Sequence, residues 1–343
     1  MEIGNKIKFL RKKAGFTQEQ LASRLGVSGQ SISKWENEIS MPDITLLPPI
    51  AEIFGVSIDE LFDFTTEEKI KRIENRIEIE EDISADVFKE YESFLLEQLT
   101  CNENRINILS LLANLYHHRM EADSLRVSKY GREAILLDPA KKDCQWLLDK
   151  AEGHAIWDWN CSGFSDAVEF YKQVIDADKG EPKSSLPYYY LIDNLLADNR
   201  ADEAEKYLKV FSALPSANPV MKDIYKAYIA LARHDVKTAD SIIALCVEEH
   251  PNDCGYLFES AQYYARRCDY KKALQLYARS WDNETAPRYS DSLQGIAKVC
   301  KIIGDKQGAT LAYERILECL SEEWGYSKDD KPFLEIKRMM SNL

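Results

Sequence analysis

The sequence predicts an all-α protein, in which a small N-terminal helical bundle is followed by a long stack of helix pairs. Apolar residues recur three and four positions apart along the chain. No segment alternates apolar and polar residues as a half-buried strand would. In the C-terminal part, small residues recur at steps of 34 to 37 residues. We therefore expect the bundle in residues 1–64, a linker helix in 65–83 and the stacked pairs in 84–343.

The overall composition is that of a soluble globular protein. The 343 residues are 45% hydrophobic and 30% charged, which fits two or three domains. No apolar run approaches the roughly 18 residues that a membrane span needs, and the start of the chain is charged rather than signal-like. These features predict a cytoplasmic protein with no membrane partner.

Charge is unevenly distributed. The net charge of −14 argues against a general nucleic-acid coat, because phosphate affinity needs clustered Lys and Arg. Residues 1–40, however, carry seven basic and four acidic side chains, a local excess of +3. Any DNA-binding surface is therefore expected at the N-terminus.

Neither a metal site nor a catalytic site is apparent in the sequence. No cysteine pair has C-x-x-C spacing, and we expect reduced, mostly buried thiols. The adjacent His117 and His118 point to different faces of a helix and do not easily share a metal ion. No nucleophile signature or Gly-rich phosphate loop is present. We expect no enzyme activity and no cofactor. The cysteines are Cys101, Cys144, Cys161, Cys246, Cys254, Cys268, Cys300 and Cys319.

The first two helices of the bundle follow from apolar spacing and from stop signals. Ile3, Ile7 and Leu10 share one face of a first helix that Gly15 ends. Thr17 then caps a second helix, since its hydroxyl can accept the free N–H of the residue three positions later. Gly26 is expected to end that second helix.

A third, a fourth and a fifth helix complete the bundle. Ser28 caps the third, with Ile32 and Trp35 facing inward. The fourth follows Pro42, with Pro48 and Pro49 tolerated only in its first turn, and the fifth runs from residue 58 to 62. The expected core is Ile7, Leu21, Leu25, Ile32, Trp35, Leu46, Ile50, Ile53 and Leu61.

Residues 3–62 closely resemble the XRE family of phage-repressor-like helix-turn-helix proteins. The resemblance is carried by GFTQEQLASRLGVSGQSISKWEN (15–37), PDI (42–44) and FGVSIDEL (54–61). Glu38 departs from the family pattern, because many members have Gly there, and Pro49 replaces a common Lys. The first change can alter how the third helix ends, and the second removes a possible phosphate contact.

The resemblance implies a sequence-specific transcription regulator that binds double-stranded DNA. Gln30 would bond adenine bidentately and Lys34 would donate to guanine. Gly29, at another base-facing position, offers only close backbone approach, and Ser31 also faces outward. Phosphate contacts are implied for Gln18, Ser28, Ser33 and Asn37. The competing interpretation makes Gln30 and Lys34 ordinary solvated surface.

The linker helix carries a narrow apolar stripe of Ile70, Ile73 and Ile77. It is interpreted as a connector, or alternatively as a short coiled-coil seam with a second subunit.

The repeat has three sequence signals. Small residues recur in two series, and a bulky residue stands four positions after each member of the first series. The small residues let paired helices approach closely, and the bulky residues fill the gap toward the next pair. This pattern resembles tetratricopeptide repeats. We expect five units from 140 to 324, preceded by degenerate ones such as residues 134–139. The first series is Ala167, Ala204, Ala239, Ala273 and Ala309, the second is Ala155, Ala227, Ala261 and Ala297, and the bulky residues are Tyr171, Leu208, Ile243, Tyr277 and Tyr313.

A helix-turn-helix fused to such repeats is similar to the RRNPP-type, peptide-sensing regulators of bacteria. That resemblance implies a homodimer on an operator with inverted repeats and a short peptide or protein effector on the concave side of the stack. Asp193 and Glu259 on one part of the groove, with Arg266 and Lys298 farther along, predict a polarised site. The alternatives are a protein-interaction adaptor tethered to DNA and an antitoxin-like autoregulator. The expected effector residues are Tyr189, Asp193, Tyr228, Phe258, Gln262, Arg266, Gln294 and Lys298.

Overall fold

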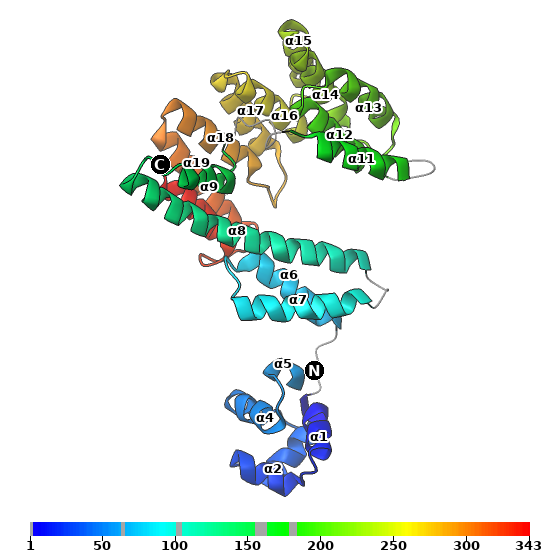
Figure 1. Ribbon diagram of the computed structural model, residues 1–343, viewed down its shortest axis with the longest axis vertical. Coiled ribbons are helices and arrows are strands. Elements are labelled where there is room, and N and C mark those ends of the chain that lie inside the picture. The colour runs from blue at the N-terminus through cyan, green and yellow to red at the C-terminus, as the bar shows by residue number, and fades with distance from the viewer. Residues whose placement is uncertain (1–2, 63–65, 101–104, 155–162, 178–183) are drawn as a thin grey trace. The chain divides into compact units, whose positions relative to one another are not determined.

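The computed structural model describes residues 3–62, 66–100, 105–154, 163–177 and 184–343 (Figure 1). The expected small residue Ala155 and the thiols Cys101 and Cys161 lie outside these ranges. Throughout the described ranges the ordered elements are helices, with no strand, which confirms the predicted fold class. The chain divides into two compact units, residues 1–78 with 83–115, and residues 79–82 with 116–343.

The first unit begins with the predicted helical bundle. Gly4 of its first helix must be glycine, because a Cβ there would lie 1.9 Å from the carbonyl oxygen of Trp35. This close approach brings the first helix against the end of the third. The bundle consists of α1 (Ile3–Lys13), α2 (Gln18–Leu25), α3 (Gly29–Glu36), the 3₁₀ turn η1 (Ile44–Leu46), α4 (Leu47–Phe54) and α5 (Ile58–Leu61).

The predicted caps and stops of the bundle are confirmed. The Thr17 hydroxyl accepts from the Gln20 N–H, and the Gln20 side chain accepts from the Thr17 N–H, so α2 begins with a capping box. Gly26 ends α2 in the left-handed region at φ 69°. Ser28 then caps α3 by accepting from the Ser31 N–H. Two helices are thus joined by a short turn whose local signals are all in the sequence.

Glu38 adopts a left-handed backbone conformation just after α3, with φ 59°. A residue with a Cβ pays a steric penalty in this region, which explains why glycine is common at this position in the family the sequence resembles. The Glu38 carboxylate accepts a 2.8 Å hydrogen bond from the Asn5 side chain. The departure therefore leaves the path of the chain intact at the cost of local strain.

The core prediction for the bundle holds, with one shift of register. Seven of the nine predicted residues are buried, whereas Leu46 and Ile53 are only partly buried. Leu46 belongs to the 3₁₀ turn, so α4 starts at Leu47. The buried face of α4 is Leu47, Ile50 and Ala51. Pro48 and Pro49 lie in its first turn, as expected.

The rest of the first unit packs the linker stripe within the chain. The helices here are α6 (Thr66–Ile79), α7 (Ala85–Thr100) and the first part of α8 (Arg105–Leu137). Ile73 is buried with Phe88, Leu95 and Leu115 of α7 and α8, and the other two stripe residues pack against the same cluster. The stripe that could have been an intersubunit seam is therefore covered by this chain itself.

The second unit consists of helices from α8 onward. Four antiparallel pairs, α12 with α13, α14 with α15, α16 with α17 and α18 with α19, follow one another along the chain, and each helix packs on the next. Their bounds are α9 (Lys142–Glu152), α11 (Ser165–Ala177), α12 (Leu186–Ala197), α13 (Ala201–Ala213), α14 (Pro219–Ala232), α15 (Val236–Glu249), α16 (Cys254–Arg266), α17 (Tyr270–Asn283), α18 (Asp291–Ile303), α19 (Lys306–Glu322) and α20 (Lys331–Ser341).

The two predicted small-residue series mark these pairs. Ala204, Ala239, Ala273 and Ala309 each occupy the fourth position of a second helix, and each is fully buried. Their partners Ala227, Ala261 and Ala297 on first helices are fully buried as well, and the described bulky residues fill the space beside them, packed in the same clusters. Close helix approach at small residues therefore carries the stack, as the period predicted. The degenerate segment 134–139 begins within the last turn of α8.

Each of the four pairs turns through the same backbone device. Asn199, His234, Cys268 and Gly304 follow the first helices in the left-handed region, at φ between 57° and 78°. The next residue donates its N–H five residues back, as Asp235 does to the Ala230 carbonyl at 2.9 Å. In the last three turns that residue is Asp, whose carboxylate caps the second helix.

Two predicted absences were checked on the described residues. None of the helices in the described ranges is both long and apolar enough to cross a membrane. In the same ranges no group of three or more His, Cys, Asp or Glu side chains is placed to hold a metal ion. Of the six described thiols, Cys246, Cys300 and Cys319 are buried and Cys268 is exposed.

Candidate DNA interface and repeat-unit cleft

Helix α3 presents two different sides. Ile32 and Trp35 are buried in the bundle core, whereas Gln30 and Lys34, on the other side of the helix, are exposed. A short helix anchored by an isoleucine and a tryptophan holds its outer side chains at a fixed orientation. An exposed amide and an exposed amine at this spacing can meet hydrogen-bonding groups of an extended ligand surface.

The N-terminus of α3 contains most of the other predicted contacts. Ser28 and Ser31 share a 2.9 Å hydrogen bond between hydroxyls, beside the cap that Ser28 gives to the Ser31 N–H. A Cβ at Gly29 would lie 2.1 Å from Oε1 of Glu19. The Glu19 carboxylate thus lies against the first turn of α3, where the positive end of the helix dipole favours it. The sequence reasoning missed this acidic neighbour, although its position in the first turn of α2 was visible.

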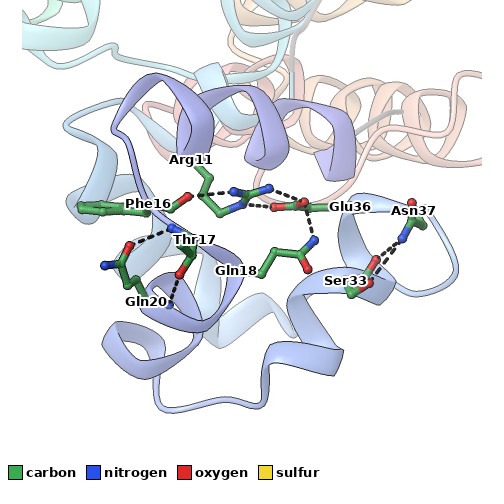
Figure 2. A network of polar contacts seen from close by, with 8 residues as sticks. All are labelled: Arg11, Phe16, Thr17, Gln18, Gln20, Ser33, Glu36 and Asn37. Carbon is green, nitrogen blue, oxygen red and sulfur yellow. Dashed lines mark hydrogen bonds and ion pairs between the residues drawn. The ribbon is translucent and has the colours of Figure 1, made fainter.

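A buried ion pair supports this surface from behind (Figure 2). The Arg11 guanidinium donates to both carboxylate oxygens of Glu36, at 2.5 and 2.8 Å, and to the Phe16 carbonyl at 2.8 Å. Arg11 is 9% exposed and Glu36 is 2% exposed. Gln18 donates to the same Glu36 carboxylate at 2.8 Å. The pair ties α1 to the end of α3 and fixes the Gln18 side chain.

Opposing effects act on the ionisation of Glu36. Burial by itself would raise the pKa of this carboxyl, but the hydrogen bonds from Arg11 and Gln18 and the nearby positive charge outweigh burial and hold the pKa below its usual range. The Arg11 pKa is raised in turn, first through its hydrogen bond to Glu36. The network is therefore charged and internally satisfied, and Arg11 is not available to an external phosphate.

Asn37 and Ser33 form a second local pair. The Asn37 amide donates to the Ser33 carbonyl at 2.8 Å and to its hydroxyl at 3.4 Å, which closes the C-terminus of α3 (Figure 2). Asn37 is exposed and Ser33 is half-buried. An amide nitrogen carries two hydrogens, so Gln18 has a further donor beyond its hydrogen bond to Glu36.

The second unit contains a cleft of about 590 Å³ between α12, α14 and α16. Five of the eight predicted effector residues line it, namely Tyr189, Asp193, Tyr228, Gln262 and Arg266. The sequence reasoning did not include Tyr225 or Glu259 in that set. The remaining lining residues are Asn194, Leu196, Ala197, Asn199, Met221, Leu231 and Ala232.

Two half-buried carboxylates dominate the chemistry of the cleft. Asp193 accepts a 2.8 Å hydrogen bond from the Tyr225 hydroxyl. Burial raises the pKa of Asp193, although that hydrogen bond and the charge of Arg266 work against the shift. Burial and the neighbouring Asp193 both raise the pKa of Glu259, and Arg266 again opposes the shift. Two acids that repel each other in a partly dry cleft favour a bound cation or a proton.

Aromatic and cationic groups complete the cleft. The Arg266 guanidinium lies over the Tyr228 ring, 5.0 Å from its centroid. Burial raises the pKa of Tyr228 and of Tyr189 to about 12, so both hydroxyls are neutral donors at physiological pH. Gln262 accepts from the Tyr277 hydroxyl at 2.7 Å, which leaves its amide nitrogen for other partners.

Three predicted effector residues are not among those that line the cleft. Phe258 packs edge-on against Tyr277 within the stack, 5.8 Å between ring centroids. Gln294 is exposed and donates to the Ser290 hydroxyl, and Lys298 is exposed on the same helix, α18. The expected polarity also differs in detail, because Arg266 shares the cleft with the carboxylates instead of lying apart from them.

A family model and curated relatives match the N-terminal bundle. The family model described as "Helix-turn-helix" matches residues 7–61. The HTH-type transcriptional activator BcrR of Enterococcus faecalis is 46% identical over 61 residues, which are 18% of this chain and 30% of that protein. An uncharacterized HTH-type transcriptional regulator of Methanocaldococcus jannaschii is 41% identical over 64 residues, which are 19% of this chain and 97% of that protein.

Among solved structures, the apo form of the competence regulator ComR from Streptococcus vestibularis aligns over 99% of this chain and 97% of its own. The sequence identity is 14% and the TM-score is 0.26. At this TM-score the arrangement of the ComR helices cannot be carried over to this chain. The strong similarity is confined to about a fifth of the chain, and this chain spans less than a third of the length of BcrR.

Proposed function

Because this chain belongs to the helix-turn-helix family of transcriptional regulators, we propose that it is a cytoplasmic regulator that reads operator DNA with α3. The observation that carries this proposal is the exposure of Gln30 and Lys34 on a helix that is held from behind by a buried core and a buried ion pair. A rigid helix with a polar outer side is what major-groove reading requires.

In this proposal Gln30 and Lys34 read base edges. Gln bonds both N6 and N7 of adenine, and Lys donates to O6 and N7 of guanine. Gln18, Ser28, Ser33 and Asn37 set the position by phosphate contacts, together with the free N–H groups at the start of α2. The local excess of positive charge in residues 1–40 supplies general attraction to phosphate, whereas the base contacts decide sequence preference.

The DNA proposal is tested with a double variant, Gln30→Ala/Lys34→Ala. A competition assay compares its binding to random duplexes with its binding to an operator that the wild-type protein has selected from them. Loss of each base contact is expected to lower discrimination by about 1–3 kcal/mol. The matched control, Asn37→Ala, weakens binding to all duplexes alike. A double variant with wild-type sequence preference would refute the assignment of α3 as the reading helix.

One module makes too few contacts for tight binding, so we propose that two copies bind an inverted repeat. The half-site centres would lie about one helical turn of DNA apart, roughly 34 Å, or a multiple of it.

The cleft of the second unit supports an effector site, and a short peptide with a positively charged end fits its chemistry. The carboxylates of Asp193 and Glu259 would receive an ammonium or guanidinium group, while Tyr189 and Tyr228 offer aromatic faces. An extended peptide would also meet the amide of Gln262. A peptide regulates DNA binding only if it binds the two DNA-affinity states unequally.

Reciprocity tests the effector. A peptide that changes DNA affinity must have its own affinity changed by operator DNA by the same factor, commonly 5–150-fold. Calorimetric titration of a short peptide whose only positive charge is its N-terminal amine, and of its N-acetylated form, with and without operator, measures both the coupling and the role of the amine. In Asp193→Asn/Glu259→Gln the free-amine peptide is expected to lose its advantage. Peptide binding without reciprocal coupling would favour the protein-interaction adaptor instead.

A further inference from the structure

Helix α8 is apolar on two sides, although among the described residues only its inner side is covered by other elements. Ile108, Leu111, Leu115 and Ala122 on its inner side are buried. A helix that packs against a core on one side ordinarily has a polar outer side, and one that is apolar all round is ordinarily buried all round. In Figure 1, α8 is the longest helix, with 33 residues.

The outer apolar residues follow a strict pattern. Starting from Ile106, steps of three and four residues alternate without a break to Leu137. Only Asp123, near the middle, is not apolar. This alternation is the heptad spacing at which one helix packs knobs into the holes of another. We call these ten residues the α8 stripe: Ile106, Leu109, Ala113, Tyr116, Met120, Asp123, Val127, Tyr130, Ala134 and Leu137.

Nine of the ten stripe residues are exposed, and Ala134 is half-buried. Tyr116 is 49% exposed, Met120 60% and Tyr130 63%, and both end residues are 82% exposed. Side chains of this size at regular spacing on one face make a continuous apolar surface, which single exposed residues do not.

Asp123 does not leave an open charge in the stripe. Its carboxylate accepts a 2.7 Å hydrogen bond from Arg126 and lies 3.7 Å from Arg119, both on the same helix. The charge is thus neutralised within the chain. A single polar residue in a heptad stripe sets register and orientation at some cost in stability.

We infer that the α8 stripe pairs with the α8 stripe of a second copy of this chain in antiparallel orientation. Size complementarity supports a second copy. Antiparallel pairing centred between Glu121 and Ala122 places Ala113 opposite Tyr130 and Leu109 opposite Ala134, small against large on both sides of the two-fold axis.

The orientation follows from the charge. Parallel pairing in register would face Asp123 with its own copy, whereas antiparallel pairing places Asp123 opposite Met120. The inference rests on the proposed function in one respect: an inverted repeat needs two copies of the helix-turn-helix, and the stripe supplies the contact that joins them.

The test is sedimentation equilibrium on the full chain. Wild type is expected to dimerise at micromolar concentration. Met120→Glu/Tyr130→Glu places two charges per chain in the stripe and is expected to weaken dimerisation on the order of 100-fold or more. Leu136→Glu is the matched control, because Leu136 is 84% exposed on the same helix but lies off the stripe. It should dimerise as wild type does.

A variant in the opposite direction separates pairing from loss of structure. Asp123→Leu completes the apolar stripe and should tighten the dimer, which a merely damaged helix could not do. Equal dimerisation of Met120→Glu/Tyr130→Glu and wild type would overturn the inference, and so would a monomeric wild type. Failure of this inference can be told apart from failure of the proposed function. A double variant that still dimerises overturns the stripe interface but leaves DNA reading by α3 standing, because the Gln30/Lys34 competition assay tests DNA reading independently of the stripe.

Discussion

The helix-turn-helix and the repeat-unit cleft both take charged side chains out of water, and they satisfy these charges in opposite ways. In the first, Glu36 is almost fully buried but receives three hydrogen bonds, two of them from Arg11. In the second, Asp193 receives one hydrogen bond from a tyrosine, and Arg266 acts on both carboxylates only at longer range.

This difference separates a rigid part from a receptive part. A buried pair that is fully hydrogen-bonded locks its helices, because removing either partner leaves an uncompensated charge. Two carboxylates that lack a close cation carry an unfavourable energy that a ligand can relieve. The helix-turn-helix is thus complete by itself, whereas the cleft is chemically suited to a partner.

The largest expected effect is the loss of the buried pair. Arg11→Met leaves the Glu36 carboxylate buried without a counter-charge and should lower the free energy of unfolding of the bundle by about 3 kcal/mol. Hydrogen exchange in the full chain measures the loss of stability, on the amides of α1 and α3 for this variant and on those of α13 and α14 for the control that follows. Arg233→Met is the control: it removes ion pairs of similar geometry with Asp202 and Glu205 on the exposed repeat surface, where little change is expected. Similar losses of stability in the two variants would contradict the difference between the buried and the exposed ion pairs.

Glu36 and the two cleft carboxyls should also contribute to stability with opposite signs as the pH falls. The lowered pKa of Glu36 means that its contribution to stability is present above the ordinary glutamate value, about 4.3, and is lost as the pH falls through the lowered pKa. The raised pKa values of Asp193 and Glu259 mean that the contribution of these two carboxyls to the stability of the repeat unit grows as the pH falls from those raised values through the ordinary carboxylate range. Carboxylates of the same unit with a lowered pKa, such as Glu203 and Asp269, contribute with the opposite sign.

The acid response is checked by hydrogen exchange at several pH values, corrected for intrinsic rates. In Asp193→Asn/Glu259→Gln the repeat unit should lose the part of its acid response that these two carboxyls supply, and should gain about 1 kcal/mol near neutral pH, while the bundle is unchanged. The same change of repeat-unit stability with pH in the wild type and in this variant would contradict the assigned burial of these carboxylates.

The smallest effect concerns the left-handed turns, which both regions use. Cys268→Gly should stabilise the repeat unit by about 0.5–1 kcal/mol, because glycine adopts positive φ without the Cβ penalty. Glu38→Gly relieves the same strain but also removes the hydrogen bond from Asn5, so its gain should be smaller. Thermal denaturation of both variants measures the two gains in stability. A gain in Glu38→Gly that equals or exceeds the gain in Cys268→Gly would show that the Asn5 contact contributes nothing to stability.

Local signals in the sequence were sufficient wherever the structure depends on near neighbours. Gly15, Gly26 and Gly55 adopt positive φ where helices were expected to stop, and Thr17 and Ser28 cap the helices that follow them. The buried alanines fall where the period placed them. Each of these features is decided within a few residues, so spacing and residue type alone specify it.

Contacts between distant residues were not specified in the same way. Arg11 and Glu36 are 25 positions apart, and the local spacing around Arg11 does not indicate that Glu36 at the end of α3 will bury it. The cleft shows the same limit: repeat positions selected Tyr189 and Tyr228 but also Phe258, which the neighbouring Tyr277 covers.

The sequence by itself determined an all-α chain, a helix-turn-helix with its caps and stops, a third helix with Gln30 and Lys34 on its outer side, and a repeat of helix pairs. These features follow from periodicity and from local backbone preferences, which act along the chain. Only the tertiary structure decided that Glu36 is paired with Arg11, that the linker stripe is covered by α7 and α8, and that Asp193 and Glu259 share a cleft. Those outcomes depend on which surfaces remain open after packing, and burial and electrostatic energy are set by neighbours that are distant in sequence.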